Sequence, residues 1–319
     1  MSKINKILVI RLSSLGDIIL SFPLLKKLRE IFPSAEIHFF TKEIYREAVE
    51  MNPFVDKIHI LGDTLSDSRK VVKENQFDLI IDIHKNFRSI YLTAFNGKNV
   101  KRYKKDNFKK FLLVNFKIDL LKNSVPVYKK YLKTISDFIK EGDYDFSTSE
   151  LVFEKEKEIE GDYIVIAPSS KHFTKRYPEN KFVNFINEFQ KNNKIKFILV
   201  GDNSETDRKI CSYISDNCSN TLNMCGKLSL NKLAGILYNS TKIITNDSAI
   251  LHLSEALGKS VNAIFGSTVK QFGFFPQLKD SKVFEISGLK CRPCTHIGRD
   301  KCPEGHFRCM EEIQLIVSS

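Results

Sequence analysis

The segment 245–268, TNDSAILHLSEALGKSVNAIFGST, carries residue types that suit anion binding. A buried apolar run ends there, and residues 249–257 have the apolar spacing of a helix that stops at Gly258. The residue types that cap helix amides are Asn246, Asp247 and Ser248. Free amides and the positive end of a helix dipole attract a diphosphate. We therefore predict an anion site, with His252 one turn into the helix and facing it.

A second candidate lies near the N-terminus, in the stretch RLSSLGD. A tight loop made by Ser13, Ser14 and Gly16 leads to Asp17, which stands at the start of a predicted helix. A carboxylate at the carboxyl end of a strand could take a proton from an acceptor hydroxyl. An ordinary helix N-terminus is the alternative interpretation. The glycine patterns of phosphate-binding and dinucleotide-binding loops are absent from this stretch.

The loop SSKHFTKR carries three cations at the predicted end of another strand. Lys171, Lys175 and Arg176 could neutralise a leaving diphosphate, in which case the reaction would need no metal. A solvated basic loop is the alternative, since lysine is common on surfaces.

Glu205 follows the strand that ends at Gly201 and lies in the first turn of a predicted helix. Its carboxylate could accept hydrogen bonds from a ribose diol. It could equally serve only to complement the helix dipole.

The last constellation is CRPCTHIGRDKCPEGHFRCM. Its four thiols are those of Cys291, Cys294, Cys302 and Cys309. One CxxC pair followed by two wider spacings could hold a structural metal ion, with His296 and His306 as alternative ligands. Packing of reduced thiols is the other interpretation. A catalytic cysteine is not indicated, because no positioned base accompanies one.

Length and charge narrow the class of protein. The 319 residues are 42% hydrophobic, and 50 Lys and Arg against 38 Asp and Glu give a net charge of +12. Such a chain is expected to form two domains. Its positive charge would attract sugar nucleotides, acidic lipids or nucleic acids, and the alternative is that the excess is only a solvated surface. The sequence shows neither a run of about 18 apolar residues nor a secretory signal pattern. We therefore expect a cytoplasmic protein whose seven cysteines are reduced.

Short β-branched runs alternate with longer amphipathic stretches along the chain. This rhythm predicts α/β units with parallel sheets covered by helices on both faces. Strands are expected at 6–12, 36–41, 57–61, 77–84, 98–103, 163–167, 196–200, 242–245 and 261–265, and helices at about 17–32, 178–192, 205–217 and 249–257. A polar stretch at 141–162 is typical of a linker and predicts domains at 1–150 and 151–319. Ligands of such folds bind outside the carboxyl ends of the strands.

Taken together, the SLGD loop, the KRYP loop, the segment 245–268 and the terminal CRPC, CPEGH and CM resemble glycosyltransferase family 9, the ADP-heptose:lipopolysaccharide heptosyltransferases. The resemblance spans nearly the whole chain in the family's order. It implies a GT-B architecture, in which two Rossmann-like parallel-sheet domains face each other across a cleft. The N-terminal domain would bind the acceptor, and the C-terminal domain, with its cysteine-containing tail, would bind the nucleotide sugar.

The resemblance also implies roles for single residues. Family members invert the anomeric centre and need no metal or other cofactor for chemistry. Asp17 matches the proposed catalytic base, Lys175 the lysine that contacts the donor's phosphates, and Glu205 the acid that holds the ribose. The matching donor-binding segment comprises Asp247, Ser248, Ala249 and His252. Ala249 departs from the glycine usual in the family, so the backbone approaches a diphosphate less freely.

The leading hypothesis is an inverting transfer of heptose from ADP-heptose to the inner core of lipopolysaccharide, with peripheral contact to an anionic membrane surface. One alternative keeps the enzyme class and changes the acceptor to a protein hydroxyl or another surface glycan. A further alternative is a non-catalytic nucleotide-binding protein, although the presence of Asp17 and Lys175 argues against it. No nucleic-acid-binding module is recognised, so nucleic acid is not an expected partner.

Overall fold

The computed structural model describes residues 4–94, 99–139, 150–155 and 159–317. The chain forms two compact units. Unit 1 comprises Met1–Lys105 and Val127–Val152, and unit 2 comprises Asp106–Pro126 and Phe153–Ser319. The predicted division at residue 150 differs in one respect, because it assigns residues 106–126 to the first domain. Nothing in the local sequence of this segment tells on which unit it packs.

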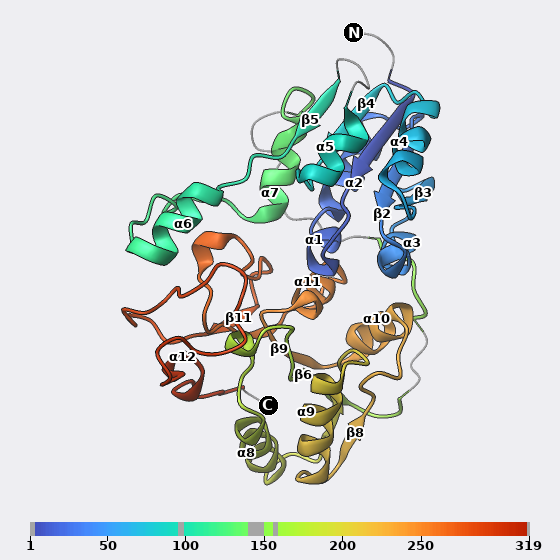
Figure 1. Ribbon diagram of the computed structural model, residues 1–319. Helices are drawn as coiled ribbons and strands as arrows, with labels where there is room; N and C mark the ends of the chain where they lie inside the picture. The colour runs from blue at the N-terminus through green and yellow to red at the C-terminus, as the bar shows by residue number, and fades with distance from the viewer. Residues whose placement is uncertain (1–3, 95–98, 140–149, 156–158, 318–319) are drawn as a thin grey trace. The chain divides into compact units, whose positions relative to one another are not determined.

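Unit 1 is an open parallel sheet with helices (Figure 1). Its strands are β1 (Lys6–Ile10), β2 (Glu36–Thr41), β3 (Lys57–Ile60), β4 (Leu79–Asp82) and β5 (Val100–Arg102), in the spatial order β3-β2-β1-β4-β5. Its helices are α1 (Leu15–Ile19), α2 (Phe22–Ile31), α3 (Arg46–Glu50), α4 (Leu65–Glu74), α5 (Phe87–Thr93) and α7 (Val127–Leu132), with 3-10 turns η1 (Glu43–Tyr45) and η2 (Lys133–Ile135). Strand β1 is central, and all its residues except the first are buried. The chain therefore leaves the middle of the sheet where α1 begins.

The single helix predicted for residues 17–32 is wrong. The structure has two helices instead, because α1 ends at Ile19 and α2 begins at Phe22. Pro23 lies in the first turn of α2, where its missing amide and fixed φ suit a helix start and disfavour continuation of a preceding helix. The short α1 thus carries Asp17 as a separate turn.

Unit 2 repeats the parallel α/β plan with six strands. They are β6 (Tyr163–Ala167), β7 (Lys196–Leu199), β8 (Thr221–Asn223), β9 (Lys242–Asn246), β10 (Asn262–Ile264) and β11 (Lys282–Phe284), in the order β11-β10-β9-β6-β7-β8. The helices are α6 (Asn107–Phe116), α8 (Glu179–Gln190), α9 (Glu205–Asp216), α10 (Leu230–Asn239), α11 (Ala249–Ala256) and α12 (Arg308–Glu311), with 3-10 turns η3 (Phe173–Lys175) and η4 (Lys270–Phe272). Strands β6 and β9 are adjacent, so their carboxyl ends bring two predicted loops together.

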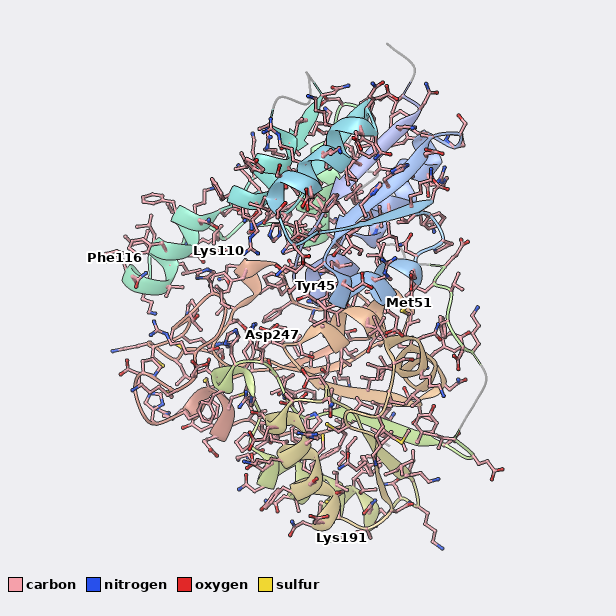
Figure 2. All side chains as sticks on the ribbon, turned by 45° about the vertical axis from the view of Figure 1, so that its right-hand side comes forward. Tyr45, Met51, Lys110, Phe116, Lys191 and Asp247 are labelled. Carbon is pink, nitrogen blue, oxygen red and sulfur yellow. The ribbon has the colours of Figure 1, made fainter. Side chains whose placement is uncertain are left out.

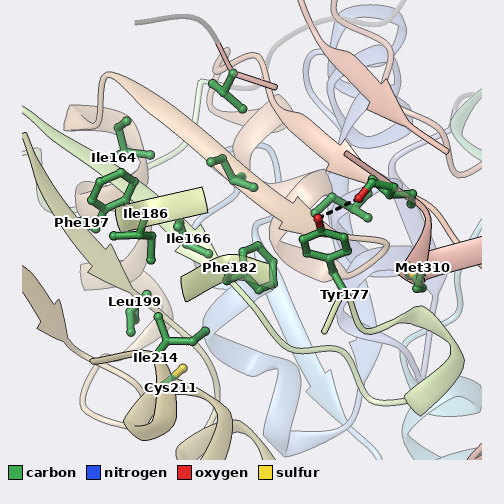
Figure 3. Packing of buried hydrophobic residues seen from close by; sticks show 14 of the residues in the cluster. Ile164, Ile166, Tyr177, Phe182, Ile186, Phe197, Leu199, Cys211, Ile214 and Met310 are labelled. Carbon is green, nitrogen blue, oxygen red and sulfur yellow. Dashed lines mark hydrogen bonds between the residues drawn. The ribbon is translucent and has the colours of Figure 1, made fainter. Parts of the chain in front are cut away.

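The core of unit 2 includes the end of the chain (Figure 3). Phe182 of α8 and Phe197 of β7 are fully buried, and each such side chain contributes about 1.5–3 kcal/mol of stabilisation. Met310 belongs to the same cluster. The Tyr177 hydroxyl donates a hydrogen bond of 3.0 Å to the carbonyl of Ile313. The cysteine-containing tail is therefore packed into the unit.

Within the described residues, no helix combines the length and the apolar character that a membrane span requires.

Candidate active site

Asp17 is held at the carboxyl side of β1 by three side chains. Its Oδ2 lies 2.6 Å from Nη2 of Arg11 and accepts a hydrogen bond of 2.9 Å from the Ser14 hydroxyl. The Tyr131 hydroxyl, on α7, donates to Oδ1 at 3.0 Å. The Asp17 side chain remains 17% exposed. The carboxylate is thus oriented by its neighbours and still reachable.

Arg11 is fixed in turn by the backbone around it. Its Nη1 donates to the Ile83 carbonyl at 2.7 Å, and its Nε donates to the Ser13 carbonyl. The guanidinium also lies 5.8 Å from the centre of the Tyr131 ring. Gly16, the third predicted loop residue, lies within α1. The predicted loop residues Ser13 and Ser14 therefore act here by holding Arg11 and Asp17.

The ionisation of Asp17 follows from these contacts. Burial alone would raise its pKa, but the charge of Arg11 and the hydrogen bonds from Ser14 and Tyr131 hold the pKa below its ordinary value. Burial and the nearby Asp17 carboxylate raise the pKa of Tyr131 well above its ordinary value. Asp17 is therefore a carboxylate and Tyr131 a neutral donor at neutral pH.

Two more basic groups border this carboxylate. Burial and the charges of Arg11 and Lys105 lower the pKa of His84 to about 4. Burial and the charge of Arg11 lower the pKa of Lys105 as well. Such mutual effects require these groups to lie near one another. Near neutral pH His84 is therefore uncharged, and the cations near Asp17 are Arg11, which is paired with Asp17 itself, and Lys105.

In unit 2, Lys175 and Asp247 form a buried ion pair at the carboxyl ends of β6 and β9 (Asp247 is labelled in Figure 2). Lys175 Nζ lies 2.7 Å from Asp247 Oδ2, and the two side chains are 14% and 5% exposed. The Thr268 hydroxyl donates to the same Oδ2 at 2.7 Å. The Asp247 carboxylate is therefore already bonded to Lys175 and Thr268, and it fixes the position of the Lys175 ammonium group.

The helix mouth at α11 differs from the prediction. Asn246 accepts a hydrogen bond from the Tyr177 amide and donates to Pro168, and Asp247 is paired as described. Ser248 occupies the N-cap position without capping, and its hydroxyl lies 3.2 Å from that of Thr245. The expectation that these three side chains cap the helix is therefore wrong. They bond to the neighbouring strands and loops, and the N-cap side chain of α11 makes no capping hydrogen bond.

Ala249 is the first residue of α11, and His252 lies one turn later. The His252 side chain is buried, at 6% exposure, beside the ring of Phe274. The first turn contains no acidic residue. An anion at this mouth would meet the uncapped amides and the Lys175 ammonium group in the same unit.

The other cations of the KRYP loop point elsewhere. Arg176 turns back on its own loop, donating to the carbonyls of Ser170 and Lys171. Lys171 is exposed. Lys175 is the loop cation that the described contacts bring to Asp247.

Glu205 is the first residue of α9, as predicted, and is 75% exposed. Its Oε1 lies 2.6 Å from Nζ of Lys209, one turn later. The charge and hydrogen bond of Lys209 lower its pKa. Among the described residues no contact joins Glu205 to Lys175 or to Asp247, so a ribose role for Glu205 stays a prediction.

The four terminal cysteines do converge, since all of them line one pocket with an empty volume of ≈ 320 Å³. His306 lines it too, with Nε2 3.9 Å from the Cys291 sulfur. Burial raises the pKa of Cys294, and burial with the other thiols raises that of Cys309 to about 12. No group of three or more His, Cys, Asp and Glu side chains in the described ranges has metal-binding geometry. The predicted structural metal, including the alternative ligand His296, is therefore not supported.

Sequence reasoning missed Arg11, His84, Tyr131 and Thr268 as neighbours of the predicted residues. Polar residues directly after a buried strand could have indicated Arg11 and His84, because they follow β1 and β4. Tyr131 gives no such signal, since it lies 114 residues from Asp17.

The chain matches a known protein family over most of its length. Residues 67–304 match the family described as glycosyltransferase family 9 (heptosyltransferase). The chain is 26% identical over 296 residues to lipopolysaccharide heptosyltransferase 1 of Campylobacter coli, which covers 82% of this chain and 84% of that protein. It is 23% identical over 313 residues to lipopolysaccharide heptosyltransferase 1 of Pseudomonas aeruginosa, covering 91% and 86% of the two chains.

Among solved structures, the ADP-heptose lipopolysaccharide heptosyltransferase II of E. coli aligns with a TM-score of 0.70 at 19% identity. The alignment covers 96% of this chain and 98% of that one. Likeness at this identity shows the fold. The predicted GT-B class, with two Rossmann-like parallel-sheet domains, is confirmed.

Proposed function

This chain belongs to glycosyltransferase family 9 (heptosyltransferase) and is a glycosyltransferase, and from that premise we propose that it transfers heptose from ADP-heptose to the inner core of lipopolysaccharide. The observation that carries the proposal is the pairing of Lys175 with Asp247 beside the uncapped mouth of α11. A cation and free amides at the carboxyl edge of a parallel sheet suit the diphosphate of a nucleotide sugar.

On the donor side, unit 2 supplies positive charge. Lys175 and the first amides of α11 receive the diphosphate, and they stabilise the negative charge that develops on ADP as it leaves. Asp247 takes no direct part in phosphate binding, because a carboxylate repels phosphate and this one already holds Lys175 and Thr268. Its role is to position Lys175. Ser248, Ala249 and His252 complete the donor segment.

On the acceptor side, unit 1 supplies the base. Asp17 accepts the proton of the attacking hydroxyl while that oxygen bonds to the anomeric carbon and the bond from this carbon to the phosphate oxygen breaks. A single displacement of this kind inverts the anomeric centre. Since the pKa of Asp17 is low, the base is weak, and it takes the proton late, when the hydroxyl has become acidic.

Two features make a metal unnecessary in this scheme. Lys175 and the helix mouth supply the charge that a divalent cation would otherwise bring to the leaving group. Lys105, a cation near Asp17, would attract the acid or phosphate groups of an inner core. Because such an acceptor is anchored in a bilayer, we place the enzyme at the cytoplasmic face of the membrane.

The test is sugar transfer by purified protein from ADP-heptose to deacylated lipopolysaccharide core. Asp17→Asn keeps the shape of the side chain and removes the base, so transfer should fall about 10²–10⁴-fold. The affinity for ADP, measured by calorimetry, should not change, since ADP binds unit 2.

Asp67→Asn is the matched control, because Asp67 occupies the same position of α4 and accepts a hydrogen bond from its own cap residue, Thr64. It should transfer sugar like the parent. Undiminished transfer by Asp17→Asn would refute the base assignment. ADP binding without transfer to the core, but with transfer to a protein hydroxyl, would change the acceptor.

A further inference from the structure

The segment between the two parts of unit 1 carries an unusual surface. Five large apolar side chains there are exposed: Phe108 by 70%, Phe111 by 52%, Phe116 by 61%, Ile118 by 49% and Leu120 by 53%. They lie within thirteen residues of α6 and the turn after it. Single exposed apolar residues are ordinary, but a cluster of this kind marks an interaction surface. We call these five residues the α6 patch.

The opposite side of the segment is anchored to unit 2. Leu113 and Leu121 are buried against Phe272 of η4. Lys117 Nζ donates to the Pro293 carbonyl at 2.7 Å, and Gln271 donates to Asp119 at 3.1 Å. The α6 patch is therefore the outward side of a docked element, and Figure 2 shows Phe116 at the outer end of that helix. Because other apolar residues already hold the segment, its exposed phenyl rings are not needed to fold it.

Charge identifies the kind of partner. The stretch 104–122 contains six lysines and two aspartates. Lys104, Lys109 and Lys122 are exposed beside the α6 patch. Apolar and aromatic residues interleaved with lysines are typical of elements that lie in the interface of an anionic bilayer. A second copy of the chain would bring like charges together, which disfavours self-association through this face.

Nucleic acid fits the surface less well. Phenyl rings stack on bases, but Ile118 and Leu120 offer no stacking plane, and both are about half exposed. Aliphatic side chains are favourable where the partner is the acyl boundary of a lipid layer. We therefore propose that the α6 patch docks this enzyme on an anionic phospholipid surface. The inference rests on the proposed function only in that the acceptor is held in a membrane.

The test measures binding of the full chain to sedimented vesicles of equal parts phosphatidylethanolamine and phosphatidylglycerol, with phosphatidylcholine vesicles as the neutral comparison. The variant replaces Phe108, Phe111 and Phe116 with serine. Its affinity for the anionic vesicles should fall by at least about tenfold, since partial burial of three rings is lost. Lys109→Ala should lower it about fivefold and the parent's binding should weaken with salt.

A matched control replaces Tyr213 and Ile316 with serine, because these side chains of unit 2 are 44% and 72% exposed and lie outside the α6 patch. Its vesicle binding should equal that of the parent. Transfer to the water-soluble deacylated core should be unchanged in the triple variant, which keeps a failure of docking distinct from a failure of the proposed function. Circular dichroism checks that the variant is folded.

Three results would overturn the proposal. The triple variant could bind anionic vesicles as tightly as the parent. The parent could prove a dimer in sedimentation that the triple variant dissociates, which would make the patch a contact between copies. Single-stranded RNA could compete fully with the vesicles and bind the parent more tightly, which would make nucleic acid the partner.

Discussion

The Tyr131 hydroxyl donates a hydrogen bond of 3.0 Å to Oδ1 of Asp17. A residue of α7 thus adds to the charge of Arg11 and the hydrogen bond of Ser14, which lower the pKa of this carboxylate against the effect of burial. Both residues belong to unit 1. The bond stabilises the charged form of Asp17, and its loss must therefore raise the pKa of this carboxylate.

Tyr131→Phe should consequently move the acid limb of the pH profile of kcat/KM to higher pH, by roughly half a unit to one unit. The direction follows because the base works only when ionised, and a higher pKa protonates it at a higher pH. Tyr91→Phe, on α5 beside Arg69, is the control and should leave the limb in place. A uniform loss of rate with an unmoved limb would mean that Tyr131 contributes packing alone.

The ion pair in unit 2 makes a separate prediction. Lys175→Ala should weaken ADP binding about tenfold to a hundredfold, as expected for loss of a charged hydrogen bond. Asp247→Asn should weaken it less, and the double variant should bind no more weakly than Lys175→Ala, because Asp247 acts by holding Lys175. Calorimetry with ADP measures all three. Additive losses would instead indicate that Asp247 contacts the nucleotide itself.

The exposed Lys171 of the same loop is the matched cation. Lys171→Ala should change ADP affinity by no more than about twofold, because an exposed charge is screened by solvent.

Glu205 offers a test of the ribose prediction. If its carboxylate accepts hydrogen bonds from the diol, Glu205→Ala should lower ADP affinity about tenfold, and the parent should lose as much when 2′-deoxy-ADP replaces ADP. The variant should not distinguish the two nucleotides. Stability should not change measurably, since the side chain is 75% exposed.

The matched control is Glu188→Ala, which removes a carboxylate that is 71% exposed and paired with Lys191 on α8. It should bind both nucleotides as the parent does. Equal ADP affinity in Glu205→Ala and the parent would reduce Glu205 to a residue that complements the helix dipole.

The sequence predicts the five strands of unit 1 and β6, β7, β9 and β10 of unit 2, because their apolar runs are short, β-branched and bounded by polar residues. The short strands β8 and β11 at the two edges of the second sheet were not predicted. The predicted 36–41 and 163–167 coincide with β2 and β6, and the predicted 205–217 exceeds α9 by one residue. The side chains that contact the predicted site residues could not be predicted in this way. The sequence pattern predicts Asp247 at the start of α11. Only the fold shows that the Asp247 carboxylate forms an ion pair with Lys175.

The packing of α6 and the exposure of its side chains could not be predicted from the sequence. The helix that begins at Asn107 has apolar residues on more than one side, and nothing local tells that it packs on Phe272, far along the chain. The fraction of Phe108 left exposed depends on that packing. The α6 patch therefore emerges from the structure, although its lysines and phenylalanines are plain in the sequence.

The last prediction concerns how the free energy of unfolding depends on pH through two histidines of unit 1, His38 and His59. His38 Nδ1 and His59 Nε2 lie 2.8 Å apart on β2 and β3, and His38 Nε2 lies 3.2 Å from Glu36. Burial, with the charges of His38 and Lys57, lowers the pKa of His59 to about 4. The unfolded chain therefore binds more protons between about pH 6.5 and 4, and stability is lost as the pH falls through that range.

His59→Gln should reduce this loss of unfolding free energy by up to about 2 kcal/mol, allowing for solvent screening of a partly exposed ring. Urea unfolding followed by circular dichroism at a series of pH values measures the slope. His306→Gln, which changes an exposed ring of unit 2, should retain the slope of the parent. If His59→Gln also retains that slope, the pair titrates alike in the folded and unfolded chain, and its burial does not destabilise the charged form.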